Sequence, residues 1–158
     1  MEQRRSSVVQ FVLWAQNAIM INGTSHVRGV ETITRYDAST QKFIVSTPCE
    51  SALKYWIGGT ANHATHIVVF SQLEINGVNQ GVHAFIAQIR DADANVCPNV
   101  RIADWVHKID LNGWFDNLRI PRQNLLNSVA SVSPYGQYLT DVKDPDQLEL
   151  KAMCEAAQ

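Results

Sequence analysis

From residue 27 onward, β-branched and aromatic residues alternate with polar ones, which is the pattern of half-buried β-strands. The alternation is clearest over residues 30–36 and again over residues 43–47. Between them, residues 37–41 include Asp and Ser, whose side chains can bond to their own following backbone in turns. Pro48 ends the second strand because proline has no backbone N–H to donate. The pattern therefore predicts a β-hairpin.

A second hairpin is predicted further along the chain. Residues 65–75 have a strand pattern, and residues 67–70 are all apolar, so both faces of this strand should be buried. Residues 76–81 are rich in turn formers and are predicted to form a loop, with residues 82–90 as the partner strand. The pattern then predicts an exposed loop at residues 91–98, strands at residues 100–106 and 114–120, a turn at Asn112-Gly113 and a stop at Pro121.

Helical spacing of apolar residues is found near the two ends. Residues 7–21 approximate one face of a helix, with a strand at the end of this segment as the alternative, and residues 147–157 form a second helical pattern. The sequence therefore predicts a mainly β fold, a small antiparallel β-barrel or sandwich with short helical ends. The predicted division is an N-terminal segment (residues 1–26), a β-domain (residues 27–130), and a loop with a short C-terminal helix (residues 131–158). At the end of the β-domain, a helix is predicted to begin near residues 124–129. In the segment after it, residues 131–137 are predicted to be a loop.

Composition narrows the class of protein. The chain has 158 residues, 46% of them hydrophobic, and a net charge of −2, which favours an ordinary globular domain. A nucleic-acid-binding protein would carry a basic excess, which is lacking, and the apolar run at residues 8–15 is far too short to span a membrane. The cysteines, Cys49, Cys97 and Cys154, lie far apart and indicate reduced thiols in an intracellular compartment.

Candidate chemistry concentrates in residues 54–66, just before the long predicted strand. Trp56 stands two residues before the pair Gly58-Gly59. Glycines let another backbone or a flat ligand approach closely, and tryptophan offers a large aromatic surface. Two interpretations follow from the residues alone, a tight corner of a β-barrel or a wall against which a planar cofactor lies.

The sequence supports metal binding and nucleophilic catalysis less well than a cofactor contact. His63 and His66 are three residues apart and His83 lies on the neighbouring predicted strand, but no carboxylate or cysteine stands at matching spacing. Polar histidines that fill the end of a barrel are the preferred interpretation, and no metal site is predicted. No Ser-His-Asp or Cys-His arrangement and no nucleotide-binding glycine motif was found.

A series of short segments occurs in a fixed order along the chain: Val27-Arg28-Gly29-Val30-Glu31-Thr32, Tyr36-Asp37, Thr47-Pro48, Lys54-Tyr55-Trp56-Ile57-Gly58-Gly59, Asn62-His63-Ala64-Thr65-His66, Gly81-Val82-His83-Ala84-Phe85, Gln88-Ile89-Arg90 and residues 115–122. Together these segments resemble the middle β-domain of the peroxisomal acyl-CoA oxidases, most closely the plant enzymes. The match runs from about Val27 to about Asp146.

The resemblance implies an enzyme that uses FAD to desaturate acyl-CoA to trans-2-enoyl-CoA in fatty acid β-oxidation. A base removes the α-proton, the flavin takes the β-hydride, and oxygen reoxidises the flavin with release of hydrogen peroxide. Gly58 matches the family's flavin-contacting glycine, with Trp56 and Gly59 beside it, so the cofactor wall is favoured over the corner. The implied location is the peroxisome, although the C-terminus carries no Ser-Lys-Leu-type signal.

The departures from the family pattern bear on activity. Where the family has Thr-Glu-Leu-Gly-His-Gly-Ser-Asn, residues 19–26 agree only at Ser25, so the family's threonine contact to the flavin has no match. A family loop is shortened at residues 111–115, and the C-terminal domain is expected after Asp146. The catalytic glutamate belongs to a helical domain that this sequence does not match, so no catalytic residue is assigned.

Three hypotheses remain open. The chain is an acyl-CoA oxidase relative that is inactive alone, a non-catalytic binding module that forms a homo-oligomer or pairs with a full-length oxidase, or a truncated gene product with little function.

Overall fold

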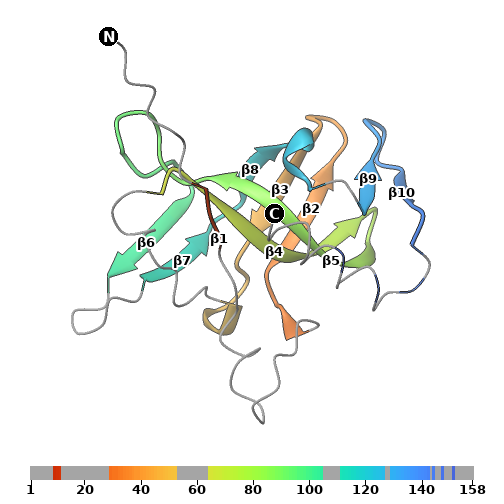
Figure 1. Ribbon diagram of the computed structural model, residues 1–158, viewed down its shortest axis with the longest axis horizontal. Helices are drawn as coiled ribbons and strands as arrows, with labels where there is room; N and C mark the ends of the chain where they lie inside the picture. The colour runs from red at the N-terminus through yellow and green to blue at the C-terminus, as the bar shows by residue number, and fades with distance from the viewer. Residues whose placement is uncertain are drawn as a thin grey trace.

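The computed structural model describes residues 9–11, 29–52, 64–104, 111–126 and 129–142, together with residues 144, 147 and 151. These residues are mostly β-strands, so the predicted mainly β class is confirmed. Three sheets are formed among them, and the described strands do not close into a barrel (Figure 1).

The largest sheet has the strand order β1-β4-β2-β3-β8, with β5 on the other edge of β4. Pairing is antiparallel except that β1 and β2 lie along successive parts of one edge of β4, both parallel to it. A long central strand with neighbours along both edges therefore organises this sheet (Figure 1). Its strands are β1 (Val9–Phe11), β2 (Ile33–Asp37), β3 (Lys42–Ser46), β4 (His66–Ile75), β5 (Val78–Gln88) and β8 (Leu118–Pro121).

Two antiparallel ribbons complete the described fold. One pairs β6 (Val100–Asp104) with β7 (Leu111–Phe115), and the other pairs β9 (Ala130–Val132) with β10 (Tyr138–Thr140). Thr47 attaches the first ribbon to the main sheet, since its N–H donates to the Phe115 carbonyl at 2.8 Å and its Oγ1 accepts from the Phe115 N–H at 3.0 Å. In Figure 1 the ribbons lie at opposite sides of the main sheet.

The core lies on both faces of the β4–β5 hairpin. Residues 67–70 are all buried, which confirms the prediction made from their unbroken apolar run. On one face, Phe43 and Phe85 meet edge to face with their ring centroids 5.1 Å apart. On the other face, Val68, Phe70, Val82 and Ala84 form a smaller cluster. Burial of each large apolar side chain stabilises the fold by about 1.5–3 kcal/mol.

The turns differ from the prediction at several places. The predicted loop at residues 76–81 is only the two-residue turn Asn76-Gly77, and β5 begins at Val78. Both turn residues have positive φ, 52° and 78°, which matches the twist of the flanking strands in a tight hairpin. The predicted loop at residues 131–137 is likewise shorter, because β9 ends only at Val132.

The turn and the strand predicted over residues 112–120 were wrong in position. Asn112 and Gly113 lie inside β7 rather than in a turn, and the single strand expected over residues 114–120 is two strands, β7 and β8. The chain turns instead at Asp116-Asn117, where Asn117 has φ 55°, a conformation that asparagine tolerates better than most residues.

Only a few residues of the predicted helices lie in the described parts of the chain. Val9–Phe11 form β1 and not part of a helix, because their backbone pairs with His66–Val68 along the edge of β4. The rest of residues 7–21 lies outside the described residues. Near residues 124–129, where a helix was predicted to begin, the described chain forms a short 3₁₀ turn, Arg122–Asn124. Leu125 then forms a β-bridge with Phe85. Gln147 and Lys151, within the predicted C-terminal helix, are helical.

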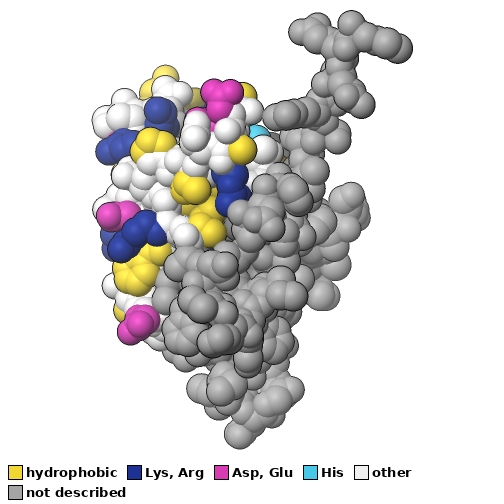
Figure 2. Space-filling view, turned by 90° about the vertical axis from the view of Figure 1, so that its left-hand side faces the viewer, with side chains coloured by type: hydrophobic (Ala, Val, Ile, Leu, Met, Phe, Trp, Pro, Cys, Tyr) yellow, Lys and Arg dark blue, Asp and Glu magenta, His cyan; other side chains and the backbone are white. Residues whose placement is uncertain are grey.

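One face of the molecule has mixed surface character. On the face shown in Figure 2, Lys and Arg lie among Asp, Glu and hydrophobic side chains without one large area of a single charge. Cys49 and Cys97 are free thiols, and Cys154 lies outside the described residues. Among the residues that the structure describes, no helix is long and apolar enough to cross a membrane.

Candidate functional site

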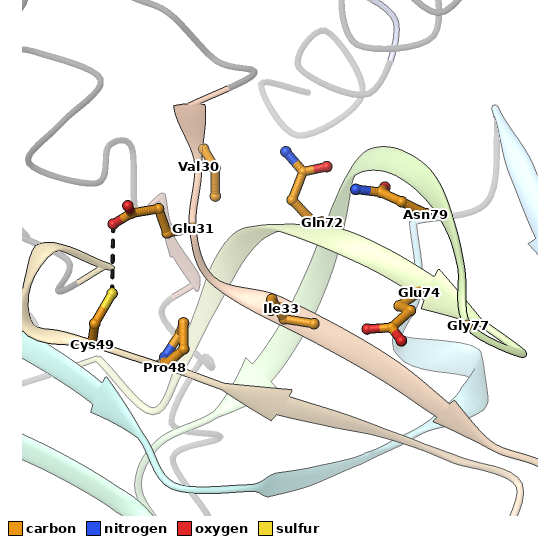
Figure 3. Close-up of a pocket in the computed structure, with 9 residues that line it drawn as sticks. All are labelled: Val30, Glu31, Ile33, Pro48, Cys49, Gln72, Glu74, Gly77 and Asn79. Carbon is orange, nitrogen blue, oxygen red and sulfur yellow. Dashed lines mark hydrogen bonds between the residues drawn. The ribbon is translucent and has the colours of Figure 1, made fainter.

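A pocket with a volume of about 420 Å³ opens where the start of β2, the turn after β3 and the far end of the β4–β5 hairpin meet (Figure 3). Glu31 and Cys49 lie at one end of the pocket, and Glu74, Gly77 and Asn79 lie at the other, as Figure 3 shows. Its lining is completed by Val30, Ile33, Pro48 and Gln72. The volume is within the range of small-molecule sites.

The first end of the pocket is fixed by hydrogen bonds between the turn after β3 and Glu31, which lies just before β2. Ser51 donates from its hydroxyl to Oε2 of Glu31 at 2.5 Å, and the Cys49 thiol donates to the same oxygen at 3.7 Å. The Cys49 Sγ and Ser51 Oγ are 3.1 Å apart. One carboxylate oxygen therefore joins two side chains of the turn that contains the 3₁₀ segment Glu50–Ala52.

The other end is held by the strand and hairpin side chains. Glu74 forms an ion pair with Nε of Arg35 at 2.9 Å, but the Arg35 side chain is 58% exposed, so the pair contributes little to stability. Asn79 accepts a hydrogen bond from the Gly81 N–H at 2.7 Å through its Oδ1. This end is thus a rim of polar groups around the apolar surface of Ile33 (Figure 3).

The charges of this pocket do not fit the pyrophosphate of FAD. Of the described residues that line it, two are glutamates and none is Lys, Arg or His. A dianionic pyrophosphate placed there would meet two carboxylates and no compensating cation. No group of three or more His, Cys, Asp or Glu residues in the described parts of the chain could hold a metal ion. The described lining of the pocket thus offers no cation for the pyrophosphate of FAD.

The predicted flavin contacts, Trp56, Gly58 and Gly59, lie outside the described residues. The structure does describe the residues on either side of this segment. Ala52 precedes it and Ala64 follows it, and both are fully buried. Thr32 donates from Oγ1 to the Ala52 carbonyl at 3.3 Å, and Arg90 donates from Nη1 to the Ala64 carbonyl at 3.0 Å.

The described histidines are engaged in separate hydrogen bonds. His66 Nδ1 lies 3.1 Å from Oγ1 of Thr65, whereas His83 is buried between the Gly81 carbonyl and the Tyr138 hydroxyl. Burial lowers the pKa of His83 below its ordinary 6.5, against a smaller opposing effect of the Gly81 carbonyl. His83 is thus a hydrogen-bonded core residue, and His63 lies outside the described residues.

The sequence alone did not identify Glu31, Ser51 or Arg90 as candidate site residues. Glu31 and Ser51 are twenty residues apart, and only the folded chain brings them together. Arg90 had a readable signal, because a charged residue directly after an apolar strand such as residues 82–89 needs a buried partner or an exit to solvent.

No family model matches the chain. Acyl-coenzyme A oxidase 3, peroxisomal, of Arabidopsis thaliana is 68% identical over 129 residues, which are 78% of this chain and 19% of that protein. The structure of Arabidopsis thaliana acyl-CoA oxidase 1 matches with a TM-score of 0.78 and 30% identity, covering 92% of this chain and 23% of that one.

A further solved structure, of Caenorhabditis elegans acyl-CoA oxidase-2 bound with FAD, ascaroside-CoA and ATP, matches with a TM-score of 0.80 and 27% identity. It covers 95% of this chain, and the match takes in 23% of that one. The fold is thus that of a β-domain from the acyl-CoA oxidases. The chain is a relative of the peroxisomal acyl-CoA oxidase family, resembles its middle β-domain, and spans about a fifth of the length of the curated relatives. This confirms the resemblance identified from the sequence.

Proposed function

We propose that the chain is the β-domain component of an acyl-CoA oxidase, in which FAD-dependent desaturation of acyl-CoA to trans-2-enoyl-CoA is coupled to reduction of O₂ to H₂O₂. The observation that carries the proposal is the 68% identity to an Arabidopsis acyl-CoA oxidase over 129 residues. The FAD and ascaroside-CoA named with a structure of the same fold support a flavin and a CoA thioester as ligands. The peroxisomal names of the relatives support the same location for this chain.

In this proposal the residues of the chain bind and orient the cofactor. Trp56 supplies an aromatic surface, and Gly58 and Gly59 let the backbone approach a flat ring without a side chain in the way. The flavin, when bound, supplies the hydride acceptor. Removal of the α-proton needs a base within hydrogen-bond reach, and no residue of this chain is assigned that role.

The chain alone is therefore expected to be inactive. Peroxide release from medium- and long-chain acyl-CoA, measured with the purified chain and added FAD, should stay at the level of a no-protein blank. A full-length oxidase relative assayed in parallel serves as the positive control. Clear turnover by the isolated chain would contradict the proposal, because it would require a catalytic base among these residues.

A second candidate function is that of a non-catalytic module that pairs with a full-length oxidase. Exposed apolar side chains in the described β9–β10 hairpin favour it, since Tyr135 is 86% exposed and Leu139 is 54% exposed. The test is co-purification of the tagged chain with an intact acyl-CoA oxidase, compared with the Tyr135→Ser/Leu139→Ser variant. Capture by the wild-type chain alone supports pairing through this hairpin, whereas a lone monomer for both contradicts it.

A further inference from the structure

The pocket at the start of β2 lies on the face of the main sheet that is turned away from the larger core cluster. Glu31, Ile33 and Arg35 alternate along the chain with two threonines that are fully buried. Side chains two residues apart in extended chain share a face, so these three form one row. The register of β2 on β4 places Glu74 beside Arg35. The row therefore has a carboxylate at each end, with Ile33 between them (Figure 3).

Glu31 keeps one carboxylate oxygen for a ligand. Its Oε2 accepts hydrogen bonds from the Ser51 hydroxyl and the Cys49 thiol, and its Oε1 has no hydrogen-bond partner among the described residues. Both donors are neutral, and neither ion pair found in the described parts of the chain includes Glu31. The negative charge at this end of the pocket is therefore not balanced by a described cation.

The carboxylate of Glu74, at the other end, is held only loosely. Its Oε2 accepts from Nε of Arg35 at 2.9 Å, and the two side chains are 58% exposed for Arg35 and 30% exposed for Glu74. An ion pair this open to solvent contributes little to stability, so Arg35 can move aside at small cost. A second cation that enters the pocket can thus share or replace the contact of Arg35 with Glu74.

Apolar side chains line the pocket between the two carboxylates. They are Val30, Ile33 and Pro48. Methylene groups laid over such a surface leave water, which favours binding. The volume of about 420 Å³ suits a small molecule. The row from Glu31 to Arg35 rises about 13 Å at about 3.3 Å per residue, which sets the length of a ligand that reaches both ends.

We propose that this pocket binds a linear small molecule with an ammonium group at each end and a polymethylene chain between them, the class of long-chain diamines and polyamines. One ammonium donates to Oε1 of Glu31, the chain lies over Ile33, and the other ammonium reaches Glu74. An ammonium suits Glu31 better than a guanidinium, because a guanidinium fork uses both carboxylate oxygens and Oε2 already accepts from two donors. The inference goes beyond the proposed function, since it requires neither flavin nor acyl-CoA.

Isothermal titration of the purified full chain with 1,8-diaminooctane at low ionic strength tests the proposal. An extended chain advances about 1.2 Å per bond, so the two nitrogens of this probe lie about 11 Å apart. It should bind saturably at one site per chain. Its affinity should be at least about tenfold higher than that of octylamine, which lacks the second charge, and of 1,3-diaminopropane, which is too short to span the row. Added salt should weaken the binding.

Two substitutions within the pocket and one beside it locate the site. Glu31→Gln keeps an acceptor for Ser51 and should weaken binding of 1,8-diaminooctane by about tenfold. Glu74→Gln leaves the turn after β3 untouched and should weaken binding by about threefold, so it tests the site even where Glu31→Gln does not fold. Glu50 is exposed in the same turn but does not line the pocket. Glu50→Gln removes the same charge and should bind as the wild type does.

Four results would each overturn the inference. The first is an absence of saturable binding by the wild-type chain. The second is equal affinity for octylamine and 1,8-diaminooctane, which would leave only the apolar contact. The third is the same loss for Glu31→Gln as for Glu50→Gln, which would show general attraction to an acidic protein. The fourth is equally tight binding of Nα-acetyl-lysine amide, which would make the occupant a lysine side chain of another protein.

Discussion

The hydroxyl of Tyr138 donates a hydrogen bond to Nε2 of His83 across 3.0 Å and so links β10 to the main sheet. The Gly81 carbonyl lies 3.1 Å from Nδ1 of the same ring, and since a carbonyl only accepts, Nδ1 carries the proton. Nε2 of the neutral ring is then the acceptor for Tyr138. Burial raises the pKa of Tyr138, so its hydroxyl keeps the proton that this bond needs.

This arrangement predicts a pH-dependent stability. The pKa of His83 is lowered in the folded chain by burial, so below the ordinary value of 6.5 the unfolded chain binds a proton that the folded chain does not. The free energy of unfolding should therefore fall as the pH drops from about 6.5 through the lowered pKa, by at most about 1.4 kcal/mol per pH unit for one proton. Urea denaturation at a series of pH values between 8 and 5 measures this slope.

The control for that series is His83→Gln, which keeps a donor and an acceptor but does not titrate in this range. Carboxylates contribute equally to both proteins, so the difference between the two slopes isolates His83. A variant with the same pH slope as the wild type would show that His83 does not cause the loss of stability.

The two turn glycines should be equally costly to replace. Gly77 and Gly136 have φ of 78° and 81°, in the left-handed region that disfavours a Cβ. A Cβ at Gly77 would meet nothing within 4 Å, and one at Gly136 would lie 3.5 Å from the Tyr36 ring, an ordinary contact. Gly77→Ala and Gly136→Ala should each destabilise the protein by about 1–2 kcal/mol, measured by thermal unfolding. A much larger loss for Gly136→Ala would mean that Tyr36 cannot accommodate the added methyl group.

The core on the Phe85 side of the β4–β5 hairpin should dominate stability. Phe85 is fully buried, packs edge to face against Phe43, and bridges to Leu125. Phe85→Ala should cost about 3–5 kcal/mol, because it removes transfer free energy and leaves a cavity. Val78→Ala is the surface control on the same strand, since Val78 is 59% exposed, and should change stability little. Similar losses for the two variants in urea denaturation would contradict this account of the core.

The order of apolar and polar residues predicted the strands in which burial is either continuous or strictly alternating. The run of residues 67–70 identifies the central strand because no polar face interrupts it, and the alternation around residues 37–41 identifies the first hairpin. Patterns failed where two turns compete, since Asn112-Gly113 has a stronger turn signal than Asp116-Asn117 but lies within a strand pair. Pairing of β7 with the preceding β6 and of β8 with the distant β3 decided that competition.

The candidate site was less predictable than the fold. Trp56, Gly58 and Gly59 were identified through resemblance and stay a prediction. The groups that bond to the residues on either side of this segment come from distant parts of the chain, since Thr32 and Ala52 are 20 residues apart and Ala64 and Arg90 are 26 apart. Periodicity and spacing do not identify the two partners of such contacts, which come together only when β2, β4 and β5 assemble.

Binding of FAD to the purified chain, followed by the change in flavin absorbance on titration, tests the central claim most directly. The wild-type chain should bind FAD saturably and Trp56→Ala should bind it at least about tenfold more weakly, in keeping with the loss of an aromatic contact surface. Trp114→Ala, which removes a tryptophan that stacks on Arg101 at 4.6 Å in the β6–β7 ribbon, should bind as the wild type does. A wild-type chain that does not bind FAD, or equal binding by Trp56→Ala and Trp114→Ala, would contradict the account.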